Sequence, residues 1–251
     1  MKSLTVLQGR RLLLASGLAC LLPAQARGHV LHVAAADFPP WSGPTLAHGG
    51  VLSQIVRLAL QTQGLGLQLH FLPWARALSE VQSGLFDALL ALPPRENDAA
   101  LAYSLPIANM QPGFFKQQSR QFNWQELSEL KYFKIGIVRG YPLPPALAGL
   151  QLNTFDSLDD ATSLRKLALG RLDLALVEKH TGHWLIARRL ADSRIPLDWH
   201  AAPLEQQAQH LAFSRKRAGH QQFLQAFNLG MQKIQDNGRL GALLRQAGLA
   251  L

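Results

Sequence analysis

The sequence predicts an α/β fold in which two units of strands and helices follow each other along the chain. Short apolar runs typical of strands alternate with helical patterns from Val30 to Leu92. The same alternation starts again after Gln121, and two further helical patterns close the chain. Each unit is therefore expected to be a mostly parallel sheet with helices on both faces.

Prolines and glycines set the limits of the elements in the first unit. Pro39 and Pro40 end a strand at 30–36, because proline cannot donate to a strand ladder. Apolar residues at helical spacing cover 51–60, and Gly64 follows them as a stop signal. The other predicted elements are a strand at 67–71, a helix at 74–83 and a strand at 88–92.

Capping patterns set the elements of the second unit. Asn123 and Glu126 predict a capping box that opens a short helix. Ser157 and Asp160 predict a second cap, on a helix that runs to Leu169. The remaining predictions are strands at 135–138, 174–177 and 210–214, and helices at 181–190, 221–235 and 239–246.

The first 26 residues predict an export signal. Lys2, Arg10 and Arg11 form a basic region, and the apolar run at 12–22 is too short to span a membrane. Ala24-Gln25-Ala26 offers the small residues of a cleavage site, so we expect cleavage after Ala26 and a periplasmic protein. The choice between the general and the twin-arginine export route stays open.

Loss of the signal changes the composition of the chain. Basic residues fall from 25 to 22 against 16 acidic ones, which leaves a net charge of +6 on 225 residues. These basic residues are scattered, so binding to nucleic acid is not expected. The single cysteine, Cys20, lies in the signal, so the mature chain is expected to hold no disulfide. The stability of the mature chain must therefore come from its hydrophobic core, which the 48% of hydrophobic residues in the full sequence makes plausible.

Six segments, in order, resemble the periplasmic solute-binding proteins of the polar amino-acid class (bacterial extracellular solute-binding protein family 3), the receptors of ABC importers. The likeness runs over essentially all of residues 29–251. The segments are Asp37-Phe38-Pro39-Pro40-Trp41, Phe71-Leu72-Pro73-Trp74-Ala75-Arg76-Ala77-Leu78, Gly84-Leu85-Phe86-Asp87-Ala88, Tyr103-Ser104-Leu105-Pro106-Ile107, Lys134-Ile135-Gly136-Ile137-Val138-Arg139-Gly140 and Leu169-Gly170-Arg171-Leu172-Asp173-Leu174-Ala175.

This resemblance implies a two-lobed, periplasmic-binding-protein-like (type II) fold with two crossing strands as the hinge. Lobe 1 would comprise 27–110 plus 210–251, and lobe 2 would comprise 111–209. The crossings are expected near 111–115 and 207–211. The ligand would lie between the lobes, where strand ends and helix N-termini converge.

Three aromatic residues and one carboxylate are candidates for ligand contact in lobe 1. Phe38 and Trp41 follow the first strand and could stack on a ligand, while Asp37 could meet a positive group. Trp74 follows the second strand, at a position that contacts ligand in the family. Phe38 and Trp41 could instead be ordinary packing residues of the lobe.

A ligand carboxylate would need an arginine, because a guanidinium can hold it with two hydrogen bonds. The sequence departs from the family at this point, since Asn97 stands where the family's arginine is expected. Arg95, Arg76 and Arg139 are the candidates to replace it, and each could instead be a solvated surface residue, Arg139 most readily.

The second lobe contributes Tyr141 and Glu178. Tyr141 is followed by Pro142, where the family offers a helix N-terminus with small hydroxyl residues, and proline has no N–H to give. Glu178 matches the family's aspartate that meets an α-amino group. His180 and His183 are spaced so that they could share a metal with Glu178, although a helix surface gives this pattern by chance, and no metal or cofactor is predicted.

The sequence thus predicts a monomeric, exported protein that binds a small polar solute, an amino acid or a related compound, for ABC-type import with a permease in the inner membrane. No acid–base pair with clear partners, nucleophile elbow or phosphate loop is present, so no catalytic residue is assigned and the chain is not expected to be an enzyme. Two alternatives stay open: a ligand sensor, and a periplasmic lyase such as a cyclohexadienyl dehydratase on the same fold.

Overall fold

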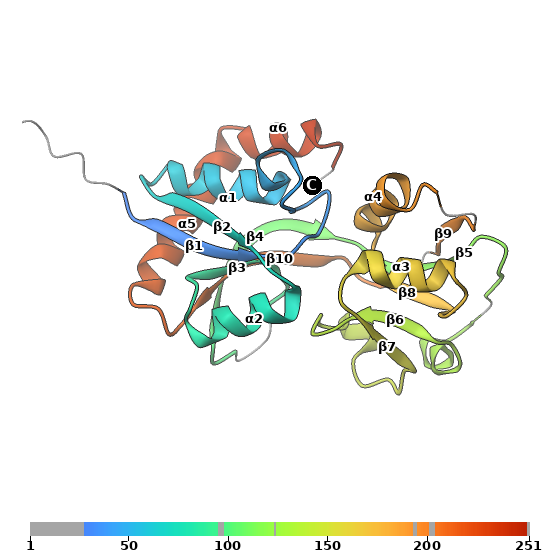
Figure 1. The fold of residues 1–251 in the computed structure, drawn as a ribbon. Helices are drawn as coiled ribbons and strands as arrows, with labels where there is room; N and C mark the ends of the chain where they lie inside the picture. The colour runs from blue at the N-terminus through green and yellow to red at the C-terminus, as the bar shows by residue number, and fades with distance from the viewer. Residues whose placement is uncertain (1–27, 95–97, 123, 193–194, 201–203, 250–251) are drawn as a thin grey trace, which may run out of the picture.

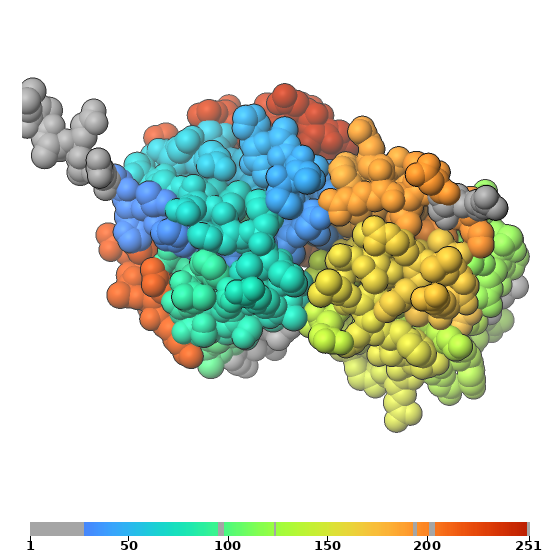
Figure 2. All heavy atoms as spheres, viewed as in Figure 1, coloured from blue at the N-terminus to red at the C-terminus, as the bar shows by residue number. Residues whose placement is uncertain are grey.

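The protein consists of two lobes that lie side by side (Figure 1), and the space-filling view shows that they touch (Figure 2). The computed structural model describes residues 28–94, 98–122, 124–192, 195–200 and 204–249. The predicted export signal and the candidate Arg95 lie outside these residues, as does Asn123 of the predicted capping box. No helix within the described ranges has the length and apolarity that a membrane crossing requires.

Lobe 1 is built on a five-stranded sheet with the order β2-β1-β3-β10-β4. Strand β1 is parallel to β2 and β3, whereas β10 is antiparallel to β3 and β4. Helices α1, α5 and α6 pack on one face and α2 on the other (Figure 1). The bounds are β1 (Val30–Ala35), α1 (Val51–Gln61), β2 (Gly66–Phe71), α2 (Trp74–Ser83), β3 (Ala88–Leu92), β4 (Leu101–Met110), β10 (Gln207–Ser214), α5 (His220–Asp236) and α6 (Arg239–Gln246), with a 3-10 helix at Ala47–Gly49.

Lobe 2 repeats this design with the order β7-β6-β8-β5-β9. Strand β6 is parallel to β7 and β8, and β5 is antiparallel to β8 and β9. The bounds are β5 (Pro112–Gln117), β6 (Ile135–Val138), β7 (Thr154–Ser157), α3 (Asp160–Ala168), β8 (Leu174–Glu178), α4 (Lys179–Arg189) and β9 (Leu197–His200), with 3-10 helices at Leu127–Tyr132 and Pro145–Leu147.

Two details of the predicted helix starts are wrong. Asp159, not Ser157, caps α3: its backbone is extended and its carboxylate accepts the Thr162 N–H at 2.7 Å. The capping box of the 3-10 helix pairs Glu126 with Glu129. In both cases a carboxylate directly before the first helical residue supplies the cap, which satisfies a free backbone N–H of the first turn.

The chain passes between the two lobes at neighbouring places. Gln111 alone separates β4 from β5, and the return runs from His200 at the end of β9 to Gln207 at the start of β10. The carboxyl ends of β1, β2 and β3 share one edge of their sheet because these strands are parallel. The loops beyond this edge face the ends of β6 and β8 in lobe 2, and this is where ligands of open α/β sheets bind.

Candidate functional site

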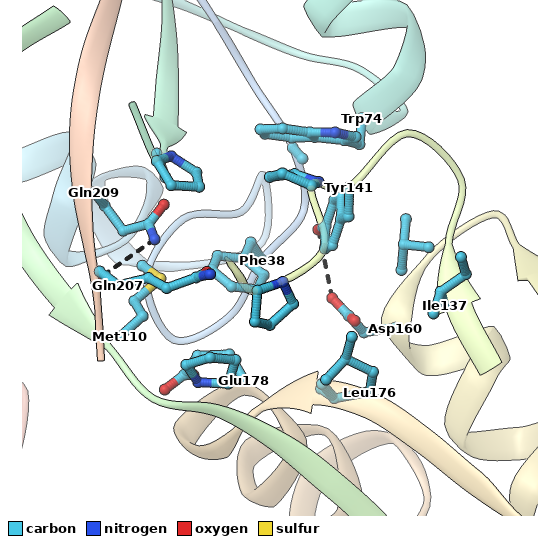
Figure 3. A pocket seen from close by; sticks show the side chains of 18 of the residues that line it. Phe38, Trp74, Met110, Ile137, Tyr141, Asp160, Leu176, Glu178, Gln207 and Gln209 are labelled. Atoms are coloured by element: carbon cyan, nitrogen blue, oxygen red, sulfur yellow. Dashed lines mark hydrogen bonds between the residues drawn. The ribbon is translucent and has the colours of Figure 1, made fainter. Parts of the chain in front are cut away.

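A pocket lies between the lobes, and its walls come from both of them (Figure 3). Its volume is about 90 Å³, which is room for several water molecules or a small solute. Lobe 1 supplies the ends of β1, β3 and β4 and the start of α2 and β10, and lobe 2 supplies β6, β8 and the loop after β6. Four prolines line it: Pro93, Pro112, Pro142 and Pro144.

An aromatic wall covers one side of the pocket (Figure 3). Tyr141 of lobe 2 meets Phe38 and Trp74 of lobe 1 edge-on, with ring centroids 6.3 and 4.9 Å apart. The Trp74 indole N–H also donates to the Gly140 carbonyl at 3.0 Å. Gly140 has φ +82°, a conformation that favours glycine, so it can turn its carbonyl toward Trp74 at the end of β6.

Glu178 stands at the N-terminus of α4, on the opposite wall. Its Oε2 accepts the Thr181 N–H at 2.8 Å and the Trp41 indole N–H at 2.9 Å. Its Oε1 is buried and has no hydrogen-bond partner. Glu178 lines the pocket, whereas Trp41 is almost fully buried beside it and does not. Trp41 therefore links the lobes instead of facing the pocket.

A salt bridge joins the lobes on the same side. Arg189, the last residue of α4, pairs with Asp37 at 2.7 Å between Nη1 and Oδ2. Asp37 is outside the pocket lining, and its Oδ1 is buried without a partner. Sequence reasoning missed Arg189, because nothing in the helix pattern distinguishes it from its exposed neighbour Arg188.

Asp160 is the second carboxylate of the pocket, and the sequence had suggested it only as a capping residue. It is 3% exposed, and its Oδ2 is 3.5 Å from the Tyr141 hydroxyl while Oδ1 has no partner (Figure 3). Burial, and then the nearby charges of Asp159 and Glu178, raise the pKa of Asp160 to about 7. Burial and the same carboxyl raise the pKa of Tyr141 well above its usual value.

Two glutamines of β10 complete the polar groups of the pocket (Figure 3). The Gln209 side chain is buried and donates to the Gln207 carbonyl at 3.3 Å. Both lie at the start of β10, in the region expected for the second crossing, but no sequence signal distinguished them as ligand contacts. Their amides offer neutral donors and acceptors opposite Asp160.

Two of the three candidate arginines, Arg76 and Arg139, do not line the pocket, and the third, Arg95, lies outside the described residues. Arg76 is exposed and pairs with Glu80 along α2 at 2.6 Å. Arg139 is exposed and pairs with Asp156 at 3.0 Å. Neither lines the pocket, and among the described residues that do, none is an arginine, lysine or histidine.

The two histidines considered for a metal site each pack against an aromatic ring. His180 packs edge-on against Trp41, and His183 against Phe115. No group of three histidine, cysteine, aspartate or glutamate side chains arranged for a metal ion occurs among the described residues.

No protein-family model and no curated protein matches this sequence. Solved structures do match. A histidine kinase sensor domain with similarity to periplasmic binding proteins has a TM-score of 0.76 at 21% identity, over 88% of this chain and 96% of that chain. The substrate-binding protein of an amino acid ABC transporter has a TM-score of 0.72 at 14% identity, over 86% and 98%.

A third structure, an amino acid ABC transporter substrate-binding protein from Streptococcus pneumoniae bound to L-arginine, has a TM-score of 0.70 at 18% identity, over 87% and 94%. At such identities the likeness establishes the fold. The chain has the two-lobed, periplasmic-binding-protein-like fold that the sequence resemblance implied.

Proposed function

We propose that this protein binds one small solute in the pocket between its lobes and closes around it, as an extracytoplasmic receptor. The observation that carries the proposal is that one pocket has walls from both lobes, while Trp41–Glu178, Asp37–Arg189 and Trp74–Gly140 connect the lobes around it. Domain closure about such a site would exclude water from the bound solute.

Delivery to an ABC permease is the favoured role. Two of the matched structures are named as substrate-binding proteins of amino acid ABC transporters, and their fold covers nearly all of this chain. Under this proposal the protein is exported, acts as a monomer and presents its closed form to a permease in the inner membrane.

Ligand sensing is the second candidate, because the sensor domain of a histidine kinase has a TM-score of 0.76 to this chain. The two roles differ in the partner that recognises the closed form. Crosslinking of the ligand-loaded protein in its native cells would capture permease subunits in the first case and a membrane-bound kinase in the second.

A thermal-shift screen of the mature protein, residues 27–251, tests solute binding directly. A ligand present at 100 times its Kd should stabilise the protein by roughly 2.7 kcal/mol. Small-angle scattering of the same sample should show a smaller radius of gyration with ligand than without.

Two matched substitutions locate the binding site. Leu176→Trp places a large ring in the pocket and should abolish the shift, whereas Leu229→Trp, at an exposed position on α5, should leave it intact. If no solute stabilises the parent protein, or if Leu176→Trp binds as well as the parent, the proposal is contradicted. Consumption of the solute during the screen would favour the lyase.

A further inference from the structure

Two carboxyl groups line the pocket without a positive partner among the residues that the structure describes. Asp160 Oδ1 and Glu178 Oε1 are both buried and both lack a hydrogen-bond partner, and both residues line the pocket. The other polar side chains of its described lining, such as Gln207, Gln209 and Tyr141, are neutral. Because a buried carboxylate without a partner is strongly unfavourable, a positive group is expected to complete the site.

The charged residues near Asp160 raise its pKa further and do not pair with it. Asp159, Glu178 and Asp37 all contribute to the raised pKa, and all three are acidic. Arg189 is engaged with Asp37, and Lys166 donates to the Asp156 carbonyl and to the Ser157 hydroxyl.

The N-terminus of α3 favours a negative charge at Asp160, but its N-cap is itself a carboxylate, that of Asp159. Arg189 and Lys166 are therefore engaged with other groups, and the helix offers only partial compensation.

We propose that the solute is a small organic cation without a carboxylate group, whose charge lies between Asp160 and Glu178 and whose apolar body lies against Phe38, Trp74 and Tyr141. This inference rests on the proposed function, because it assigns the chemical class of the same pocket's ligand. Aromatic faces attract cations through the negative potential of their rings, so the aromatic wall suits an ammonium group as well as a hydrocarbon body.

The rest of the lining disfavours a carboxylate ligand. No arginine or lysine is among the described residues of the pocket wall. The loop after β6, where a helix N-terminus could offer backbone N–H groups, carries Pro142, Pro144 and Pro145 instead. The amides of Gln207 and Gln209 suit a neutral polar group at the other end of the solute.

Binding of a cation should depend on pH with a definite sign. In the free protein the pKa of Asp160 is raised to about 7 by burial and by its acidic neighbours. A bound cation would stabilise the carboxylate and release its proton, so affinity should rise with pH up to about 7 and level off above it. A solute that accepts a hydrogen bond from protonated Asp160 would give the opposite slope.

The test is isothermal titration of the mature protein with three groups of probes: primary, secondary and quaternary amines, their neutral alcohol or hydrocarbon analogues, and α-amino acids. The amines should bind at least roughly 30-fold more tightly than the neutral analogues. For the best amine, affinity should rise by up to about tenfold per pH unit between pH 5.5 and 7, as release of one proton requires.

Three variants test which carboxyl group binds the cation and which one causes the pH dependence. Asp160→Asn should bind the amine roughly 30-fold more weakly and lose the pH slope, and Glu178→Gln should weaken binding without removing the slope. Asp236→Asn, a remote and exposed carboxylate at the end of α5, should match the parent. If Asp160→Asn does not fold, the pH slope of the parent and the Glu178→Gln titration still decide the question.

The outcomes separate this inference from the proposed function. If no probe binds and none stabilises the protein, the proposed function fails. If a neutral solute or an α-amino acid binds in the pocket more tightly than the amines, or if affinity falls with rising pH, the solute-binding function stands and the cation assignment is overturned. An amino acid whose binding is abolished by Arg95→Ala would be the clearest result of that kind.

Discussion

The indole N–H of Trp41 in lobe 1 donates to Glu178 Oε2 in lobe 2 at 2.9 Å, although 137 positions separate the two residues. The same oxygen accepts the Thr181 N–H at the start of α4. The contact thus joins a loop of lobe 1 to the helix cap of lobe 2, at a residue that lines the pocket and whose other oxygen is buried without a hydrogen-bond partner. Closure of the lobes and the shape of the binding site are coupled at this pair.

We expect Trp41→Phe to weaken ligand binding by about 1.5–3 kcal/mol, because it removes a hydrogen bond to a charged group that exists only when the lobes are closed. Calorimetric titration would measure the affinity, and scattering would show whether the ligand-free protein opens further. Trp124→Phe, in the aromatic cluster of lobe 2 away from the pocket, is the control. Equal affinities of parent and Trp41→Phe would contradict the coupling.

Arg189→Ala should also favour the open form, since it removes the salt bridge to Asp37 between the lobes. The pair is partly exposed, so the expected loss of affinity is only about 1 kcal/mol. Salt should reduce the difference from the parent, because ions screen partly exposed charges. Titrations with ligand at low and high salt would measure this difference in affinity. Arg188→Ala, at the exposed neighbouring position on α4, is the control. A difference that is unchanged by salt would argue against an ionic effect.

Phe38→Ala and Trp74→Ala should each weaken binding by roughly 1–3 kcal/mol through lost apolar contact and stacking. Both side chains line the pocket, so the loss should appear in affinity measured by titration. Tyr132→Ala provides the matched aromatic control, because Tyr132 is 73% exposed and does not line the pocket. Unchanged affinity in both pocket variants would place the ligand elsewhere.

The ligand-free protein should become less stable as pH rises from about 4 to about 7, through Asp160. Its pKa is 3.8 in the unfolded chain and about 7 in the folded protein, so the folded state holds the proton more tightly across this interval. The contribution is complete below pH 4 and is lost as pH passes 7. Denaturant unfolding of the parent and of Asp160→Asn should be measured at several pH values. The difference between their free energies of unfolding gives the contribution of Asp160, and a difference that does not change with pH would refute the prediction.

Export with cleavage after Ala26 remains a prediction from the sequence. Mass spectrometry of the protein recovered from the periplasm should show Arg27 as its first residue. A lipidated Cys20 at the N-terminus, or a chain that keeps Met1, would contradict it.

The order of most helices and strands could be predicted from the sequence, because it depends on the local spacing of apolar, proline and glycine residues. Helix α6 has the predicted bounds, and β8 differs from its predicted range by one residue. Strand β4 was not predicted as a continuous strand, since Pro106 and Asn109 interrupt its apolar pattern. It lies at the edge of the sheet, where proline is tolerated, and its pairing with β10 defines it.

The residues of the candidate site likewise fall into those that the sequence could predict and those that only the tertiary structure identified. By itself the sequence determined that Phe38 and Trp74 follow the first two predicted strands, and the parallel direction of these strands puts both loops at one edge of the sheet. The family resemblance added Tyr141 and Glu178 of lobe 2, and the structure places all four side chains at the pocket. Only the tertiary structure decided that Asp37 and Trp41 link the lobes and that Arg76 and Arg139 face solvent. It alone also placed Asp160, Gln207 and Gln209 at the pocket. The physical reason is that burial and the lack of a partner arise when distant segments pack together, and no local pattern encodes them.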